Sequence, residues 1–265
     1  NSMAQETGHG WKGEEGKNPY EVVYVNSHLL RNAITTLRRD QEDLQEIAAH
    51  AEDGSVTAQY ELGLRYFEGS RGARQEDGLA AYWFGKAAAQ GYPDARLRMG
   101  YCYEYGIGVE KDLQKAVDLY RELSDQGFAQ AQCSLGFCYE NGIGVEPSAE
   151  HAFELYLQAA EQGDAPAQCN LGYFYNNGIG TEKDASAAIQ WLSAAARQRY
   201  PRAQLILGEL YEMGDGLPQD TPKALRLYQL AAKAGYSPAQ YKLGLMYYHG
   251  VGITKNEALA VEWFE

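Results

Sequence analysis

Residues 131–144 of the chain have the sequence AQCSLGFCYENGIG, and close variants of this stretch recur along most of the 265 residues. The central phrase is Leu-Gly, in one copy Met-Gly, with a tyrosine three residues after the glycine. The six glycines are Gly63, Gly100, Gly136, Gly172, Gly208 and Gly244, and subtraction of neighbouring numbers gives 37 once and then 36 four times. A period this constant predicts a stack of similar small units, which is a solenoid.

Each unit is predicted to be a pair of helices. Ala131, Leu135 and Tyr139 are spaced four residues apart, so they share one face of a helix, and the glycine of the phrase allows a neighbouring helix to come close. Residues 141–144 (NGIG) end this helix, because glycine adopts the left-handed conformation at low cost. A second helix is predicted over residues 148–163. Such a hairpin cannot bury its apolar face alone, so the hairpins must stack.

Three regions are predicted along the chain. Residues 1–27 are expected to be a mobile or extended segment, in which residues 20–25 (YEVVYV) are extended because β-branched and aromatic residues dominate them. Residues 28–56 are expected to form one or two capping helices. Residues 57–265 hold the six repeats, of which the last is expected to be truncated. Repeat four has Arg199 at the closing position where four others have glycine, which predicts a distortion of the stack there.

The composition favours a folded protein that binds other proteins. Apolar residues make up 45% of the chain, and its formal net charge is -13. Nucleic acids and anionic membranes are bound through clustered Lys and Arg, so the acidic balance argues against both as partners. No apolar run is long enough for membrane insertion. We therefore expect a protein or peptide partner, with basic side chains.

The four cysteines occupy two repeat positions. Cys102 and Cys138 share one position in neighbouring repeats, and Cys133 and Cys169 share the other. Equivalent positions on packed helices lie roughly 9–10 Å apart, which is too far for a disulfide. We expect reduced thiols that fill small apolar spaces. Together with the lack of a signal-peptide pattern, this favours the cytoplasm.

The pattern Ala-x-x-x-Leu-Gly-x-x-Tyr-x-x-Gly-x-Gly is followed by Lys-Asp, as in residues 111–112 and 183–184, and then by Ala-Ala-x-x-Gly. It resembles the Sel1-like repeat, a relative of the tetratricopeptide repeat, over residues 57–265. The resemblance implies an all-α fold, a right-handed α/α superhelical solenoid with a short N-terminal capping segment, whose first helices line the concave face. It also implies an adaptor or scaffold that is not an enzyme.

If the first helices line a groove, the side of each first helix opposite its packing face is the candidate binding surface. It comprises the positions three residues before the Leu-Gly glycine and one, four and five after it. Aromatic side chains there offer apolar contact, acids attract basic side chains, and asparagines bond to a ligand backbone. The candidates are Tyr101, Glu104, Tyr105, Phe137, Glu140, Asn141, Tyr173, Asn176, Asn177, Glu209 and Glu212. The first two positions have packing as their alternative role, and Asn141 and Asn177 have helix termination.

No catalytic, cofactor or metal site is predicted. The five histidines are scattered, without the spacing to Cys, Asp or Glu that places metal ligands together. The Gly-x-Gly turns lack the preceding strand and the third glycine of a dinucleotide site.

Two functions remain open. The leading hypothesis is a noncatalytic scaffold that binds a peptide or protein segment on the concave face. The alternative is a regulatory or targeting arm of a larger enzyme or secreted effector, whose active domain lies outside this chain. Residues 20–25 are expected either to pack on the capping helix or to lie in a groove, and self-association through them or through the exposed C-terminal repeat is a further expectation.

Overall fold

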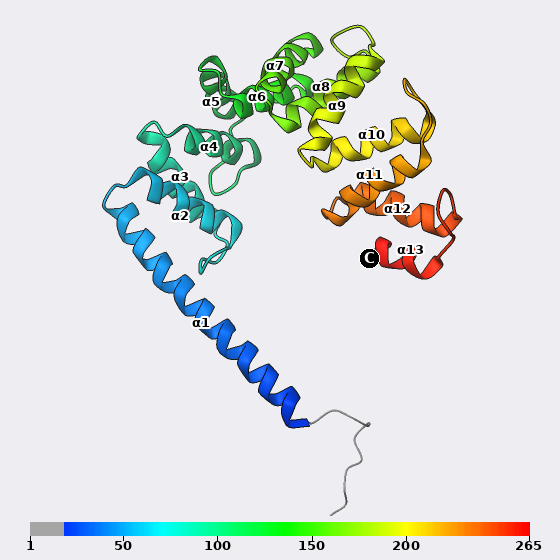
Figure 1. Cartoon of the computed structure of the whole chain (residues 1–265). Helices are drawn as coiled ribbons and strands as arrows, with labels where there is room; N and C mark the ends of the chain where they lie inside the picture. Colours follow the sequence, from blue (N-terminus) through cyan, green and yellow to red (C-terminus); the bar gives the residue numbers. More distant parts are fainter. Residues whose placement is uncertain (1–18) are drawn as a thin grey trace, which may run out of the picture. The chain divides into compact units, whose positions relative to one another are not determined.

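The computed structural model describes residues 19–265, with side chains from residue 29 onward. Every element of regular structure in this part of the chain is a helix, thirteen in all (Figure 1). The chain divides into two compact units, Asn1–Lys86 and Ala87–Glu265. The predicted all-α fold of stacked hairpins is confirmed.

In the first unit, helix α1 (Pro19–Glu52) precedes α2 (Val56–Glu68) and α3 (Asp77–Ala89), whose last residues belong to the second unit. Because α1 is one continuous helix of 34 residues, the prediction of an extended segment at residues 20–25 was wrong, and so was the predicted boundary between residues 27 and 28. β-branched and aromatic residues disfavour a helix by only a few tenths of a kcal/mol each. Pro19 is also a favourable first residue, since its missing N–H would have no partner there. The predicted mobile residues 1–18 lie outside the described part.

The C-terminal half of α1 packs on α2. Ala51 is buried, and its carbonyl accepts a hydrogen bond from Nε2 of Gln59 at 3.1 Å. Nη2 of Arg65, a residue only 2% exposed, donates to Oδ2 of Asp43 at 2.8 Å. A buried guanidinium is costly without a partner, so this ion pair fixes where α1 meets α2.

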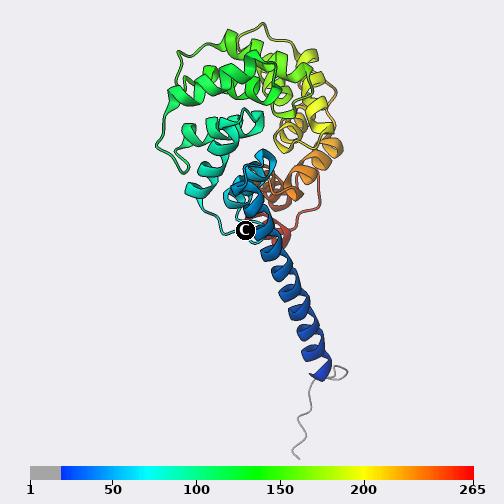
Figure 2. The same cartoon turned by 90° about the vertical axis from the view of Figure 1, so that its left-hand side faces the viewer.

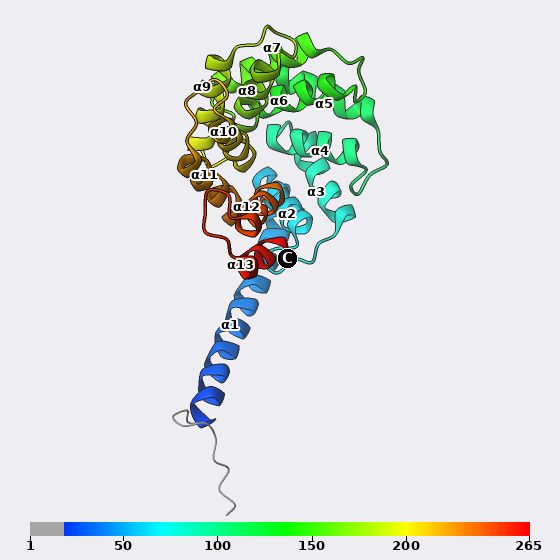
Figure 3. The same ribbon diagram turned by 90° about the vertical axis from the view of Figure 1, so that its right-hand side faces the viewer.

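The second unit continues the stack hairpin by hairpin. Its pairs are α4 (Pro93–Tyr105) with α5 (Leu113–Asp125), α6 (Ala129–Asn141) with α7 (Ala149–Glu161), α8 (Ala165–Asn177) with α9 (Ala185–Arg197), α10 (Pro201–Met213) with α11 (Thr221–Lys233), and α12 (Ser237–His249) with α13 (Glu257–Phe264). Within this unit, Figures 2 and 3 show the first helices (α4, α6, α8, α10 and α12) on the inner side of a curved stack, with the second helices outside them.

The Leu-Gly glycine is the point of closest approach within each hairpin. A Cβ atom placed on Gly136 would lie 2.9 Å from the ring of Tyr156, and one on Gly208 would lie 2.6 Å from the ring of Tyr228. Both rings are fully buried. The predicted role of the glycine in close helix packing is therefore confirmed.

Arg199 does not distort the stack at its turn, contrary to the sequence-based prediction. Its φ of 62° lies in the left-handed region that Gly163 occupies at the same position one repeat earlier. The closing hydrogen bond, from the N–H of Tyr200 to the carbonyl of Ala195, is kept at 3.1 Å. An L-residue in this conformation costs roughly 1–2 kcal/mol. The burial of the neighbouring repeats holds the turn in place against that cost.

Two glycines of the same repeat give a matched test of the packing role. Gly63→Ala would place a Cβ 2.6 Å from the buried ring of Phe84, and we expect a loss of about 1–3 kcal/mol of unfolding free energy. Gly85→Ala, in α3, meets nothing within 4 Å and should stabilise by about 0.5–1 kcal/mol through helix propensity. Urea denaturation measures both, and equal effects would contradict the packing role.

Candidate protein-binding surface

The predicted aromatic residues form a regular row on the inner helices of the second unit. Tyr101, Phe137 and Tyr173 occupy the position after the Leu-Gly glycine in α4, α6 and α8, and they are 40%, 41% and 36% exposed. We call these three residues the aromatic row. Exposed rings at one position of three successive repeats offer a ligand a strip of repeated apolar contacts.

A fourth ring widens this strip at α4. Tyr105 is 52% exposed, and its ring centroid lies 4.5 Å from that of Tyr101, one helical turn away. Partial burial and the neighbouring carboxylate of Glu104 raise the pKa of Tyr105 to about 12. The phenol therefore stays neutral at physiological pH and can donate a hydrogen bond.

Three of the four predicted acids are bonded to the second helix of their own hairpin. Tyr120 donates its hydroxyl to Oε2 of Glu104 at 2.8 Å, Tyr156 to Glu140 at 2.6 Å, and Tyr228 to Glu212 at 2.6 Å. We call these the Glu–Tyr pairs. Burial first, and then the carboxylate, raise the pKa of all three tyrosines, so the hydroxyls remain donors. The acids thus have a structural role that was not predicted.

Where the second helix lacks the hydroxyl, the acid is absent too. In repeat four the residue equivalent to these tyrosines is Leu192, and the candidate position on α8 holds Asn176. A half-buried carboxylate without its hydrogen bond is costly, which explains the joint change.

The asparagines that end the inner helices take the structural role that was the alternative. Nδ2 of Asn141 donates to the carbonyl of Phe137 at 3.0 Å, and Nδ2 of Asn177 donates to that of Tyr173 at 2.9 Å. Each bond satisfies a carbonyl in the last helical turn. The amide N–H groups of Asn141 and Asn177 are therefore used in hydrogen bonds within their own helices.

Two neighbouring acids on α10 titrate in opposite directions. Burial raises the pKa of Glu209, with nearby Lys242 opposing and Glu212 adding to the rise. For Glu212, burial is outweighed by hydrogen bonds from Lys242 and Tyr228, which lower its pKa. Nζ of Lys242 lies 2.8 Å from Oε2 of Glu212.

Two basic residues lie on the candidate binding surface but outside the four positions per repeat from which the candidates were chosen. Lys242 lies two residues before the Leu-Gly glycine of α12, and Arg202 lies six before that of α10. Arg202 donates to Oδ1 of Asn170 and lies 5.6 Å above the ring of Tyr173. Continuing the helical spacing of the candidate face by one turn would have found both residues.

A sequence model of the Sel1 repeat matches six segments, residues 56–92, 93–128, 129–164, 165–200, 201–236 and 237–265. The chain belongs to the Sel1 repeat family. Sel1 repeats generally mediate protein–protein interactions, and proteins of this scaffold family are typically noncatalytic.

The Sel1 repeat protein of Oxalobacter formigenes has a similar structure, with 34% identity and a TM-score of 0.70 over 79% of this chain and 84% of that one. Another is c5321, a protective antigen of uropathogenic Escherichia coli, with 31% identity and a TM-score of 0.54 over 83% of this chain and 55% of that one. Among curated proteins, the Arabidopsis thaliana ERAD-associated E3 ubiquitin-protein ligase components HRD3B and HRD3A are 33% and 36% identical over 90 and 69 residues. These matches span 34% and 26% of this chain, and only 14% and 10% of the relatives.

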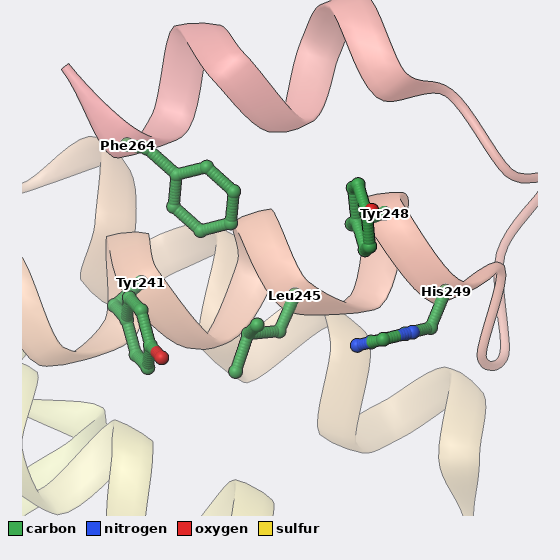
Figure 4. A pocket seen from close by; sticks show the side chains of 5 residues that line it. All are labelled: Tyr241, Leu245, Tyr248, His249 and Phe264. Atoms are coloured by element: carbon green, nitrogen blue, oxygen red, sulfur yellow. The ribbon is translucent and has the colours of Figure 1, made fainter.

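The last Sel1 repeat carries an open apolar groove of about 470 Å³. Four of its lining residues come from α12, namely Tyr241, Leu245, Tyr248 and His249, and Phe264 of α13 closes one side (Figure 4). They are the four candidate positions of the sixth repeat together with the ring that lies on Gly244. The groove therefore continues the candidate face to the end of the described stack.

The four cysteines of the Sel1 repeats form no disulfide. All four are free, as expected, and burial raises the pKa of Cys138 to about 12 and that of Cys169 to about 11.

Within residues 19–265 no group of three or more His, Cys, Asp or Glu could hold a metal ion. None of the helices described, the long α1 included, combines the length and apolar character needed to cross a membrane.

The two acids of α10 give a test with opposite signs. Glu212 has a lowered pKa, so its ionised form stabilises the fold above its ordinary pKa, and this contribution is lost as pH falls through the folded-state pKa. Glu212→Gln should therefore lower Tm at pH 7, with the difference fading in acid. Glu209 has a raised pKa, so its ionisation destabilises the fold as pH rises, and Glu209→Gln should raise Tm at pH 7. Thermal unfolding at pH 7 and pH 3 measures both, and shifts of the same sign at pH 7 would refute the assignment.

Proposed function

We propose that the chain is a noncatalytic protein-interaction module that binds a peptide or protein segment along the inner face of its Sel1 repeats. The observation that carries the proposal is the aromatic row, exposed at one position of three successive inner helices. Large rigid rings contribute much of the binding energy at protein interfaces. Asn176 and Tyr105 beside the row supply hydrogen bonds to a ligand backbone.

The second candidate is that these repeats are the regulatory or targeting arm of a larger enzyme or secreted effector. The curated relatives that the chain matches are several times longer than the matched segments, which favours this reading. By analogy with their names as components of a ligase assembly, we propose that the repeats contribute binding rather than chemistry. We also propose a reducing compartment such as the cytoplasm, supported by the four free cysteines.

The aromatic row is tested by the triple variant Tyr101→Ala, Phe137→Ala and Tyr173→Ala. With about 1 kcal/mol or more expected from each ring, affinity for a partner recovered by pull-down should fall by more than about 100-fold. Isothermal titration calorimetry measures the change, and circular dichroism verifies that helicity is kept.

The matched control is Tyr82→Ala, since Tyr82 is 52% exposed but lies on the second helix α3. It should leave affinity unchanged. An unaltered affinity in the triple variant, or an equal loss in the control, would sink the assignment of the binding face.

We further propose that α1 pairs two copies of the chain. Leu30, Ile34 and Leu37 are 62%, 51% and 61% exposed, with the alternating spacing of four and three residues found in coiled coils. The same spacing continues from Leu44 to Ala51, where α1 packs on α2. The apolar seam thus has a partner in its C-terminal half, and a second α1 supplies one for the rest.

Size-exclusion chromatography with light scattering tests this pairing. The chain should elute as a dimer of its 29.4 kDa mass, and the variant Leu30→Gln, Ile34→Gln and Leu37→Gln should elute as a monomer. The control triple Asn32→Gln, Thr35→Gln and Thr36→Gln changes other exposed positions of the same turns and should stay dimeric. A monomeric unmodified chain at micromolar concentration would refute the pairing.

A further inference from the structure

One of the Glu–Tyr pairs already holds a cation supplied by the protein itself. Nζ of Lys242 lies 2.8 Å from Oε2 of Glu212 and 5.5 Å from the ring centroid of Tyr228. The ammonium thus meets a carboxylate and an aromatic face together, a combination that binds cations well. Lys242 belongs to the inner helix of the following repeat, two residues before its Leu-Gly glycine.

The same position is not basic beside the other two pairs. For the pair of Glu104 and Tyr120, the equivalent of Lys242 is Ser134, and for the pair of Glu140 and Tyr156 it is Asn170. Neither Glu104 nor Glu140 forms an ion pair with the described residues. A serine side chain is neutral and much shorter than a lysine, so Ser134 brings no cation to Glu104.

The carboxylate of Glu104 has one oxygen without a hydrogen-bond donor among the described residues. The residue is only 7% exposed, its Oε2 accepts from Tyr120, and its Oε1 is buried with no hydrogen-bond partner among the described residues. A buried carboxylate oxygen without a donor is costly. Glu140 differs, because it is exposed to solvent and the positive charge of Arg202 reaches its partner Tyr156.

Aromatic side chains stand beside this carboxylate on the inner face. Tyr101 and Tyr105 flank Glu104 in sequence, are exposed, and have ring centroids 4.5 Å apart. α4 is the inner helix of the second unit that offers two exposed tyrosines and an acid within one turn.

We propose that Glu104, Tyr101 and Tyr105 form a subsite for one cationic side chain, lysine or arginine, of the bound peptide. The proposal rests on the proposed function and names the chemistry of its ligand. The incoming cation takes the place beside Glu104 and Tyr120 that Lys242 takes beside Glu212 and Tyr228. It pairs with the carboxylate of Glu104 and lies against the tyrosine rings.

An internal cation tests the subsite without any partner. Ser134→Lys places an ammonium at the position that Lys242 occupies three repeats later, and it should raise Tm at pH 7 by about 2–4 °C. Ser134→Gln, of similar length but neutral, should give no rise. The gain should vanish when Ser134→Lys is combined with Glu104→Gln. No rise with lysine, or an equal rise with glutamine, would overturn the subsite.

A small probe then tests binding from solution. N-acetyl-lysine methylamide, titrated at millimolar concentration into the full chain, should shift the aromatic NMR signals of Tyr101 and Tyr105, and the neutral norleucine analogue should not. Glu104→Gln should weaken the lysine probe at least tenfold, and Ser134→Lys, which leaves Glu104 in place, should abolish its binding. Glu140→Gln should have no effect.

These outcomes separate the subsite from the wider proposal. Equal binding of the norleucine analogue, or binding unaltered by both Glu104→Gln and Ser134→Lys, overturns the subsite even if a peptide binds the aromatic row. Failure of the aromatic-row variant to weaken a partner, with lysine binding intact, overturns the peptide face and leaves the subsite standing.

Discussion

The rest of the structure depends on one contact, in which a large side chain of the second helix, a ring in five of the six repeats, lies on the Leu-Gly glycine of the first. Because glycine has no side chain, the ring can rest on the backbone of the inner helix, and a Cβ there would come within 2.9 Å of it at Gly136. This contact sets the separation of the two helices in each hairpin. The separation in turn fixes the step by which hairpins stack.

The same ring links the packing of the core to the chemistry of the surface. When it is a tyrosine, its hydroxyl reaches the inner helix one turn beyond the glycine and bonds a glutamate there. In repeat four Leu192 takes the place of the ring, and the facing residue is Asn176. When the ring is Phe84 or Phe264, the facing residues are Phe67 and Tyr248. Each glutamate of a Glu–Tyr pair is thus held in place by the hydroxyl of a buried tyrosine.

The features that could be predicted from the sequence are those that depend on residue spacing within one repeat. Helix pairs, turn glycines and the packing face follow from spacing within one repeat, and all were found. The Glu–Tyr pairs were missed because they join residues on two helices, whose approach only the folded hairpin defines. The joint change at Asn176 and Leu192 is the signal in the repeats that would have revealed them. The N-terminal helix was missed at residues 20–25 because propensity differences there are small compared with the continuity of a helix.

In a repeat protein, equivalent positions of different repeats can be compared directly, because the repeats share one backbone arrangement and differ in single side chains. Lys242 completes the pair of Glu212 within the chain, so that acid offers little net charge to a ligand. Ser134 leaves the pair of Glu104 incomplete, with a buried oxygen in want of a donor. The core contact is alike in both repeats, so the proposed difference in binding chemistry comes from positions outside it, among them Ser134 in place of Lys242. Selectivity can therefore change at such positions while the ring and the glycine keep the fold constant.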